Sequence, residues 1–111
     1  MDQISIPAPK GGQTVILTYE VAFGTFDELL ALLNGAYEDI LVHQPGFLGA
    51  AIHVNDARTR VASYSQWESR EAFLNVLKTP EMQSVNRKLG DLSKGFEPVL
   101  YDIERVHMAA G

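Results

Sequence analysis

The spacing of apolar residues in this chain switches repeatedly between the period of a strand and the period of a helix. Alternating apolar residues predict strands at residues 14–21, 47–54, 59–67 and 98–106. Steps of three and four residues predict helices between them, at 25–45 and 69–94. The order β-α-β-β-α-β predicts an α+β fold of the ferredoxin-like type, in which helices cover one face of an antiparallel sheet.

Residues typical of caps and turns mark the boundaries of these segments. Thr25, followed by Glu28, fits a capping box at the start of the first helix, and Pro45-Gly46 ends it. Residues 55–58 form a short link that predicts a β-hairpin. Thr79-Pro80 predicts an N-cap and a first helical residue, so the second helical segment is divided there.

Composition narrows the class of protein. A chain of 111 residues that is 46% hydrophobic is the size of one domain and can bury a core. It has 14 acidic and 9 basic residues, and the basic ones do not cluster, so nucleic acid and anionic membranes are poor candidate partners. We expect an N-terminal arm at 1–12, one domain at 13–107 and a C-terminal tail at 108–111. No leader peptide or membrane span is evident, so we expect a cytoplasmic protein.

Alternation divides each strand between the two faces of the sheet. In the second strand it would place four apolar residues on the face without helices, namely Leu48, Ala50, Ile52 and Val54. An apolar sheet face of this kind predicts docking to a second copy of the chain. The alternative is a single sheet with one wetted face.

Trp67 is the only tryptophan and ends the third strand. By alternation it shares a face with Ser63 and Ser65. The indole could therefore wall a flat pocket and donate its N–H to a ligand oxygen. The alternative is an ordinary core tryptophan.

His53 is a second candidate, because Phe47, Gly49 and Ala51 would lie on its side of the second strand. The small side chains leave volume for a cavity between sheet and helices, whereas the alternative is a half-exposed histidine bonded to the backbone. Tyr37 could reach the same place, as could Tyr19, and both are also explained as core aromatics.

Several kinds of site are not predicted. The three histidines, His43, His53 and His107, form no pair at ligand spacing with a carboxylate, and cysteine is absent, so we expect no metal site. The glycines match neither a dinucleotide-binding fingerprint nor a phosphate-binding loop. An enzyme with this sequence would work without metal, flavin or nicotinamide.

Three stretches carry a resemblance to a known family. Residues 43–47 (HQPGF), 59–61 (TRV) and 64–73 (YSQWESREAF) resemble the antibiotic biosynthesis monooxygenase (ABM) family. The resemblance covers about 14–106 and is most specific between His43 and Phe73. It implies a dimeric α/β barrel, in which the sheets of two subunits pack face to face.

The resemblance also implies an activity. Members of the family in polyketide pathways oxidise anthrone-type phenols to quinones with molecular oxygen and no cofactor. A deprotonated polycyclic phenol can reduce oxygen itself, so the protein need only bind it, stabilise the anion and exclude water. The implied function is a cofactor-independent monooxygenase that takes a small aromatic or polycyclic phenol or quinol as its substrate. Two alternatives stay open: a non-catalytic small-molecule-binding dimer, and an isomerase or cyclase on the same scaffold.

The family's site residues correspond by position to residues of this chain. They imply catalytic roles for Trp67, His53 and Arg87. They imply substrate-binding roles for Ser63, Phe73 and Leu17, and we expect Tyr37 to bind the substrate with them. Leu17 and Ser63 stand where the family has asparagines, and Phe73 where it has a tyrosine. Ideal helix geometry places Arg87 opposite the apolar stripe of its helix, on the solvent side.

Overall fold

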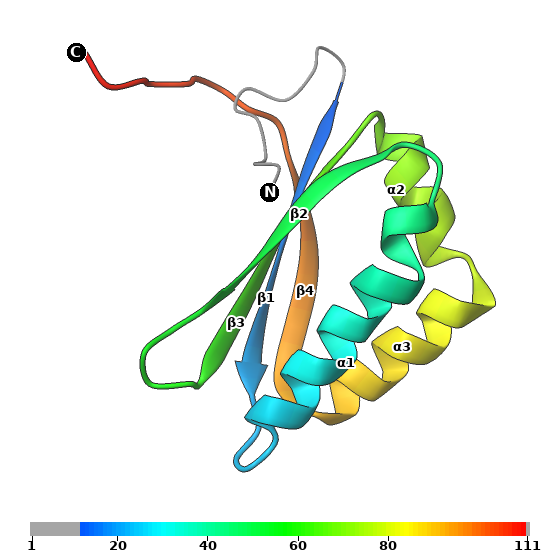
Figure 1. Ribbon diagram of the computed structural model, residues 1–111, viewed down its shortest axis with the longest axis vertical. Helices are drawn as coiled ribbons and strands as arrows, with labels where there is room; N and C mark the ends of the chain where they lie inside the picture. The colour runs from blue at the N-terminus through cyan, green and yellow to red at the C-terminus, as the bar shows by residue number, and fades with distance from the viewer. Residues whose placement is uncertain (1–11, 111) are drawn as a thin grey trace.

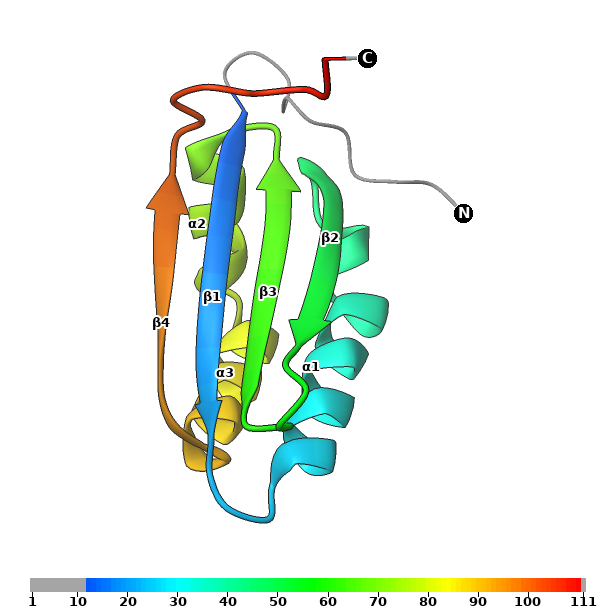
Figure 2. The same ribbon diagram turned by 90° about the vertical axis from the view of Figure 1, so that its left-hand side faces the viewer.

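A computed structural model describes residues 12–110, and its elements follow the predicted order (Figure 1). They are β1 (Gln13–Val21), α1 (Phe26–Asp39), the 3₁₀ turn η1 (Leu41–His43), β2 (Phe47–Val54), β3 (Arg60–Trp67), α2 (Arg70–Leu77), α3 (Pro80–Asp91) and β4 (Ser93–Tyr101). The strands form one antiparallel sheet in the order β2-β3-β1-β4. Figure 2 shows the strands side by side with the three α-helices behind them. The α+β ferredoxin-like fold is confirmed. The predicted arm at 1–12 lies outside the described residues except for Gly12.

The last strand is shifted from its predicted position. We expected it at 98–106, whereas β4 begins at Ser93 and ends at Tyr101. The reason is its partner, since β4 pairs with β1 from Val21 opposite Ser93 to Thr14 opposite Tyr101. Tyr101 lies opposite Thr14, the second residue of β1, so only Gln13 of that strand remains beyond it, and a segment without a partner strand gains no ladder hydrogen bonds.

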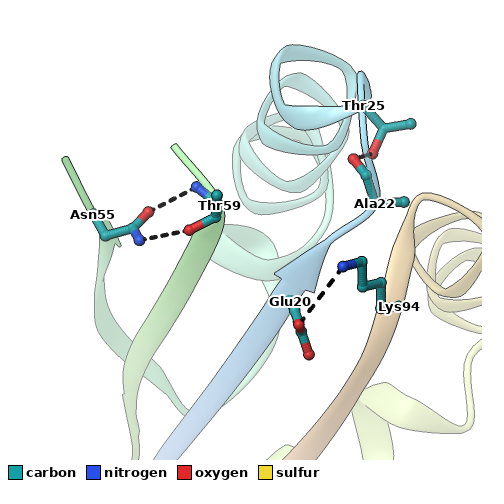
Figure 3. Close-up of polar contacts among 6 residues, drawn as sticks. All are labelled: Glu20, Ala22, Thr25, Asn55, Thr59 and Lys94. Atoms are coloured by element: carbon teal, nitrogen blue, oxygen red, sulfur yellow. Dashed lines mark hydrogen bonds and ion pairs between the residues drawn. The ribbon is translucent and has the colours of Figure 1, made fainter. Parts of the chain in front are cut away.

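The capping box expected at Thr25 does not form. Its side chain accepts no hydrogen bond from the first turn of α1. The hydroxyl group of Thr25 donates instead toward the carbonyl oxygens of Ala22, at 2.8 Å, and Leu92, at 2.7 Å (Figure 3 draws the first). Thr25 therefore ties the start of α1 to the end of α3. The caps of the other helices follow their sequence signals, because Ser69 and Thr79 accept from backbone N–H groups three residues ahead.

The predicted hairpin between β2 and β3 is present. The carboxamide of Asn55 accepts from the backbone N–H of Thr59 at 2.9 Å and donates to the Thr59 hydroxyl at 2.8 Å, which closes the loop (Figure 3). At the opposite edge of the sheet, the ammonium group of Lys94 on β4 lies 3.9 Å from the carboxylate of Glu20 on β1 (Figure 3). Both contacts are exposed and contribute little beyond fixing the strand ends.

The predicted face assignment of β2 is wrong. Phe47 lies opposite Trp67, but the next pair is Gly49 opposite Gln66, so a bulge at Leu48 adds one residue. Because side chains alternate with a period of two, one extra residue exchanges the faces of everything that follows. Ala50, Ile52 and Val54 therefore share the helix-covered face, opposite Ser65, Ser63 and Val61. Gly49, Ala51 and His53 lie on the uncovered face.

The core has two parts, both between the sheet and the helices. One gathers around Trp67, Phe73 and Met82, and the other around Tyr19, Leu29 and Leu89. Three half-buried residues, Leu17, Tyr37 and Val85, pack against both parts. The seam between the two parts is where an internal site can form.

Candidate active site

A cavity of about 50 Å³ lies at this seam, between the inner face of the sheet and the helices. Strands β1, β3 and β4 form its floor, and α1, α2 and α3 its roof. The polar residues that line it are Tyr19, Tyr37, Ser63, Ser65 and Asn86. Among the lining residues that the structure describes, none is an acid, a histidine, a lysine or an arginine. The cavity is therefore largely apolar with a few neutral hydrogen-bonding groups.

Aromatic side chains form one wall. Trp67 is 1% exposed, and its ring contacts Phe47 and Phe73 edge-on, with centroids 5.2 and 5.6 Å away. The indole Nε1–H donates to Ser65 Oγ at 3.0 Å. Trp67 thus presents a flat apolar surface, while its single N–H is already engaged within the protein.

Tyr37 and Ser63 form the main polar contact in the cavity. The phenol oxygen of Tyr37 lies 2.5 Å from Ser63 Oγ, and Ser63 is 1% exposed. Burial raises the pKa of Tyr37 above its ordinary value, and hydrogen bonds with Ser63 and Ser65 partly oppose this. Burial also raises the pKa of Tyr19, with a smaller contribution from Tyr37 nearby. Both phenols are therefore protonated at neutral pH and able to donate.

The structure brings together five of the seven residues expected at the site. Leu17, Tyr37, Ser63, Trp67 and Phe73 all line the cavity. It does not bring in the other two. His53 is exposed on the opposite face of the sheet, because of the bulge in β2. Arg87 is exposed on α3, as its helical position indicated.

Asn86 was not anticipated. It lines the cavity from α3 and is half-buried. Its sequence signal was available, because Met82, Asn86 and Leu89 follow at steps of four and three residues and so share one helix face. A carboxamide on an otherwise apolar stripe is a candidate for a polar role inside the fold. The family resemblance implies a role for the neighbouring Arg87 instead.

Other sites are absent from the described part of the chain. Within residues 12–110, no three side chains of His, Cys, Asp or Glu lie close enough together to hold a metal ion. None of the helices in this range is long and apolar enough to cross a membrane.

Comparison with known families decides the relationship. Residues 13–88 match the sequence profile of the antibiotic biosynthesis monooxygenase (ABM) family. The chain belongs to this family. A curated relative, the tetracenomycin-F1 monooxygenase of Streptomyces glaucescens, is 31% identical over 70 residues. The alignment covers 63% of this chain and 62% of the length of that relative.

Solved structures of similar proteins share the ABM fold. The ActVA-Orf6 monooxygenase of Streptomyces coelicolor, in complex with nanaomycin D, matches with a TM-score of 0.81 and 24% identity over 96% of this chain and 100% of its own. SnoaB of Streptomyces nogalater, described as a cofactor-independent oxygenase, matches with a TM-score of 0.78 and 20% identity over 86% of this chain and 96% of its own. At these identities the likeness shows the fold of this chain.

Proposed function

We propose that this protein is a cofactor-independent monooxygenase that oxidises a small aromatic or polycyclic phenol or quinol. The observation that supports it is the internal cavity, which joins an aromatic wall at Trp67 and Phe73 to neutral hydrogen-bond donors at Tyr37 and Ser63. A flat phenol would stack on the wall and place its oxygen at the donors. The description of SnoaB as cofactor-independent and the nanaomycin D bound to ActVA-Orf6 support the same reading.

The stoichiometry explains why no cofactor is needed. Conversion of a methylene group of an anthrone-type phenol to a carbonyl group is a four-electron oxidation. One molecule of oxygen accepts four electrons, so one oxygen atom enters the product and the other leaves as water. The substrate supplies all the electrons, and the protein stabilises the phenolate and excludes water.

The size of the cavity adds a constraint on the substrate. Its volume, about 50 Å³, is a third of the roughly 150 Å³ of an engineered apolar cavity that takes up benzene. A ringed substrate therefore has to displace wall side chains when it enters. Met82 and Leu77 line the wall from the helices, and methionine in particular adapts its shape easily.

We also propose that the protein is a homodimer in the cytoplasm. The uncovered face of the sheet carries apolar residues on all four strands, namely Ala51, Ala62, Ile16 and Val99. Packing of two such faces would remove them from water. His53 lies on this face, so its implied role, like that of Arg87, stays a prediction from the family resemblance.

Oxygen uptake tests the proposed reaction. Purified protein is incubated with a panel of phenolic polycycles and quinols, with and without oxygen, and its metal and flavin contents are measured. We expect uptake of one O₂ per product, and isotopically labelled oxygen should place one atom in the product. Product formed equally without oxygen would indicate an isomerase or cyclase, and binding without turnover a binding protein.

Ser63→Asn sharpens this test, because it restores the carboxamide that the family has at this position. The adjacent cavity has room for the larger side chain, so we expect the rate of oxygen uptake to rise by about tenfold. Gln83→Asn, at an exposed position of α3, is the control and should leave the rate unchanged. A Ser63→Asn protein that folds and gains no activity would count against a substrate oxygen at this end of the cavity.

A further inference from the structure

Two polar groups in the cavity are without a hydrogen-bond partner within residues 12–110. Tyr19 is 2% exposed and lines the cavity, yet its phenol group makes no hydrogen bond with any described residue. The carboxamide of Asn86, also in the lining, has none either. A buried phenol normally finds a partner. No fully buried side-chain oxygen or nitrogen of the described residues lacks one, so the Tyr19 oxygen is accessible to a molecule the size of water. Side chains of this kind that border a cavity indicate a ligand that supplies the missing partner.

The groups around these two are all neutral donors or donor–acceptors. Tyr37 lies near Tyr19 and is hydrogen-bonded to Ser63, which can donate to Tyr37 and so leave the Tyr37 proton for a ligand. Asn86 adds an NH₂ group from the opposite side, on α3. Two phenol O–H groups and one amide therefore line the same small cavity, in apolar surroundings where such hydrogen bonds are strongest.

The same cavity lacks a base. The described residues that line it from β1, α1, η1, β3, α2, α3 and β4 include no carboxylate and no histidine, and the only titratable groups are Tyr19 and Tyr37. Burial raises the pKa of both phenols, so neither ionises near neutral pH to accept a proton. A ligand that becomes an anion here must lose its proton to water, before or during entry.

We propose that Tyr19, Tyr37 and Asn86 are the oxyanion-binding residues of this cavity, and that its ligands are phenols or enols acidic enough to ionise without a protein base. This deepens the proposed function and rests on it for the identity of the reaction. In this chain the phenols and the helix carboxamide take the place of the asparagines that Leu17 and Ser63 replace. The substrate is thereby selected by its own acidity as well as by its shape.

Binding of a chromophoric phenol tests the proposal without any need for turnover. The probe is 4-nitrophenol, whose absorbance reports ionisation, and the matched neutral compound is 4-nitroanisole, which has no proton to lose. We expect the wild-type protein to bind the phenolate at least about tenfold more tightly than the anisole, and to lower the pKa of the bound phenol by about one unit.

Variants locate the donors. Tyr19→Phe and Asn86→Leu should each weaken phenolate binding by about tenfold, since each removes one hydrogen bond to a charged oxygen, and should leave anisole binding unchanged. Gln83→Leu, on the exposed side of the same helix as Asn86, is the control and should bind both compounds as the wild type does. A thermal unfolding transition shows whether each variant is folded. Because Asn86 is only half-buried, we expect at least Asn86→Leu to fold.

The outcomes separate this proposal from the proposed function. Equal affinity of the wild type for phenolate and anisole would overturn the assignment of the oxyanion-binding residues. An unchanged preference for phenolate over anisole in both variants would overturn it as well. Oxygen uptake at the wild-type rate in Tyr19→Phe and Asn86→Leu would also overturn it, while the oxygenase function stands. A phenolate preference that depends on both residues, in a protein that consumes no oxygen, supports this proposal and rejects the oxygenase function.

Discussion

The inner face of the sheet, under the helices, carries Ser63, Ser65 and Trp67 around a cavity, whereas the outer face carries Ala51, His53 and Tyr64 with no helix over it. The same two strands, β2 and β3, supply both sets. Ile52 and His53 are neighbours in the chain, yet one packs in the core and the other is exposed. The role of a side chain here depends on the face it occupies more than on its chemical type.

The strongest test of this comparison is a charge on the inner face. Ile52→Glu places a carboxylate against the core beside Ser63, where water cannot solvate it fully. We expect the free energy of unfolding, measured by urea denaturation, to fall by about 3 kcal/mol. Unchanged stability would mean that Ile52 faces outward and that the bulge in β2 is misplaced.

The neighbouring substitution tests the outer face. Ala51→Glu puts a charge on the surface proposed to pair with a second subunit, so two like charges would meet in the dimer. We expect sedimentation to show that the affinity of dimer association falls by about a hundredfold, with the protomer still folded. Gln83→Glu, on an exposed helix position, should leave the association unchanged. A wild-type protein that sediments as a monomer would refute the dimer itself.

The two buried tyrosines of the inner face predict a loss of stability at alkaline pH. Their pKa values are raised in the folded protein, whereas the unfolded chain has the ordinary value of about 10. Below pH 10 both states keep the protons, so their contribution is fully present. Above it the unfolded chain releases protons first, and the free energy of unfolding falls by up to about 1.4 kcal/mol per pH unit for each tyrosine that stays protonated in the folded protein. Urea denaturation between pH 8 and pH 11.5 measures this slope, and Tyr19→Phe should make it shallower.

Trp67→Phe distinguishes a wall from a hydrogen-bond donor. The indole N–H already donates to Ser65, so its removal should lower the free energy of unfolding by about 1–2 kcal/mol. Turnover per folded molecule should fall by less than about tenfold, because an aromatic wall is retained. A loss of a hundredfold or more in oxygen uptake, at unchanged stability, would show that the indole N–H contacts the substrate instead.

His53→Ala should have the smallest effect. The side chain is exposed on the outer face and lies on the other side of the sheet from the cavity. We expect the free energy of unfolding to change by no more than about 0.5 kcal/mol, and oxygen uptake by less than about twofold. A large loss of activity would restore the role that the family resemblance implies, with His53 acting from the outer face.

Much of this arrangement could be read from the sequence. The alternation in β3 predicted that Ser63, Ser65 and Trp67 share one face of the sheet. Their pairing with every second residue of β1 follows that pattern. The family resemblance, from the stretch around Trp67, was confirmed by the profile match at 13–88. The helical stripe that contains Met82 and Leu89 also contains Asn86, so the position of Asn86 in the lining follows from the helical period.

Other features depended on contacts between segments distant in the sequence. The bulge in β2 depends on pairing with β3, and the end of β4 on where β1 begins. The partner of the Thr25 hydroxyl, Leu92, is 67 residues away along the chain. Periodicity within one segment follows from covalent backbone geometry, so the sequence alone determined the elements, their order and most of their buried faces. Register, bulges and hydrogen-bond partners follow from pairing and packing between segments, so only the tertiary structure decided that His53 lies outside the cavity and Asn86 within it.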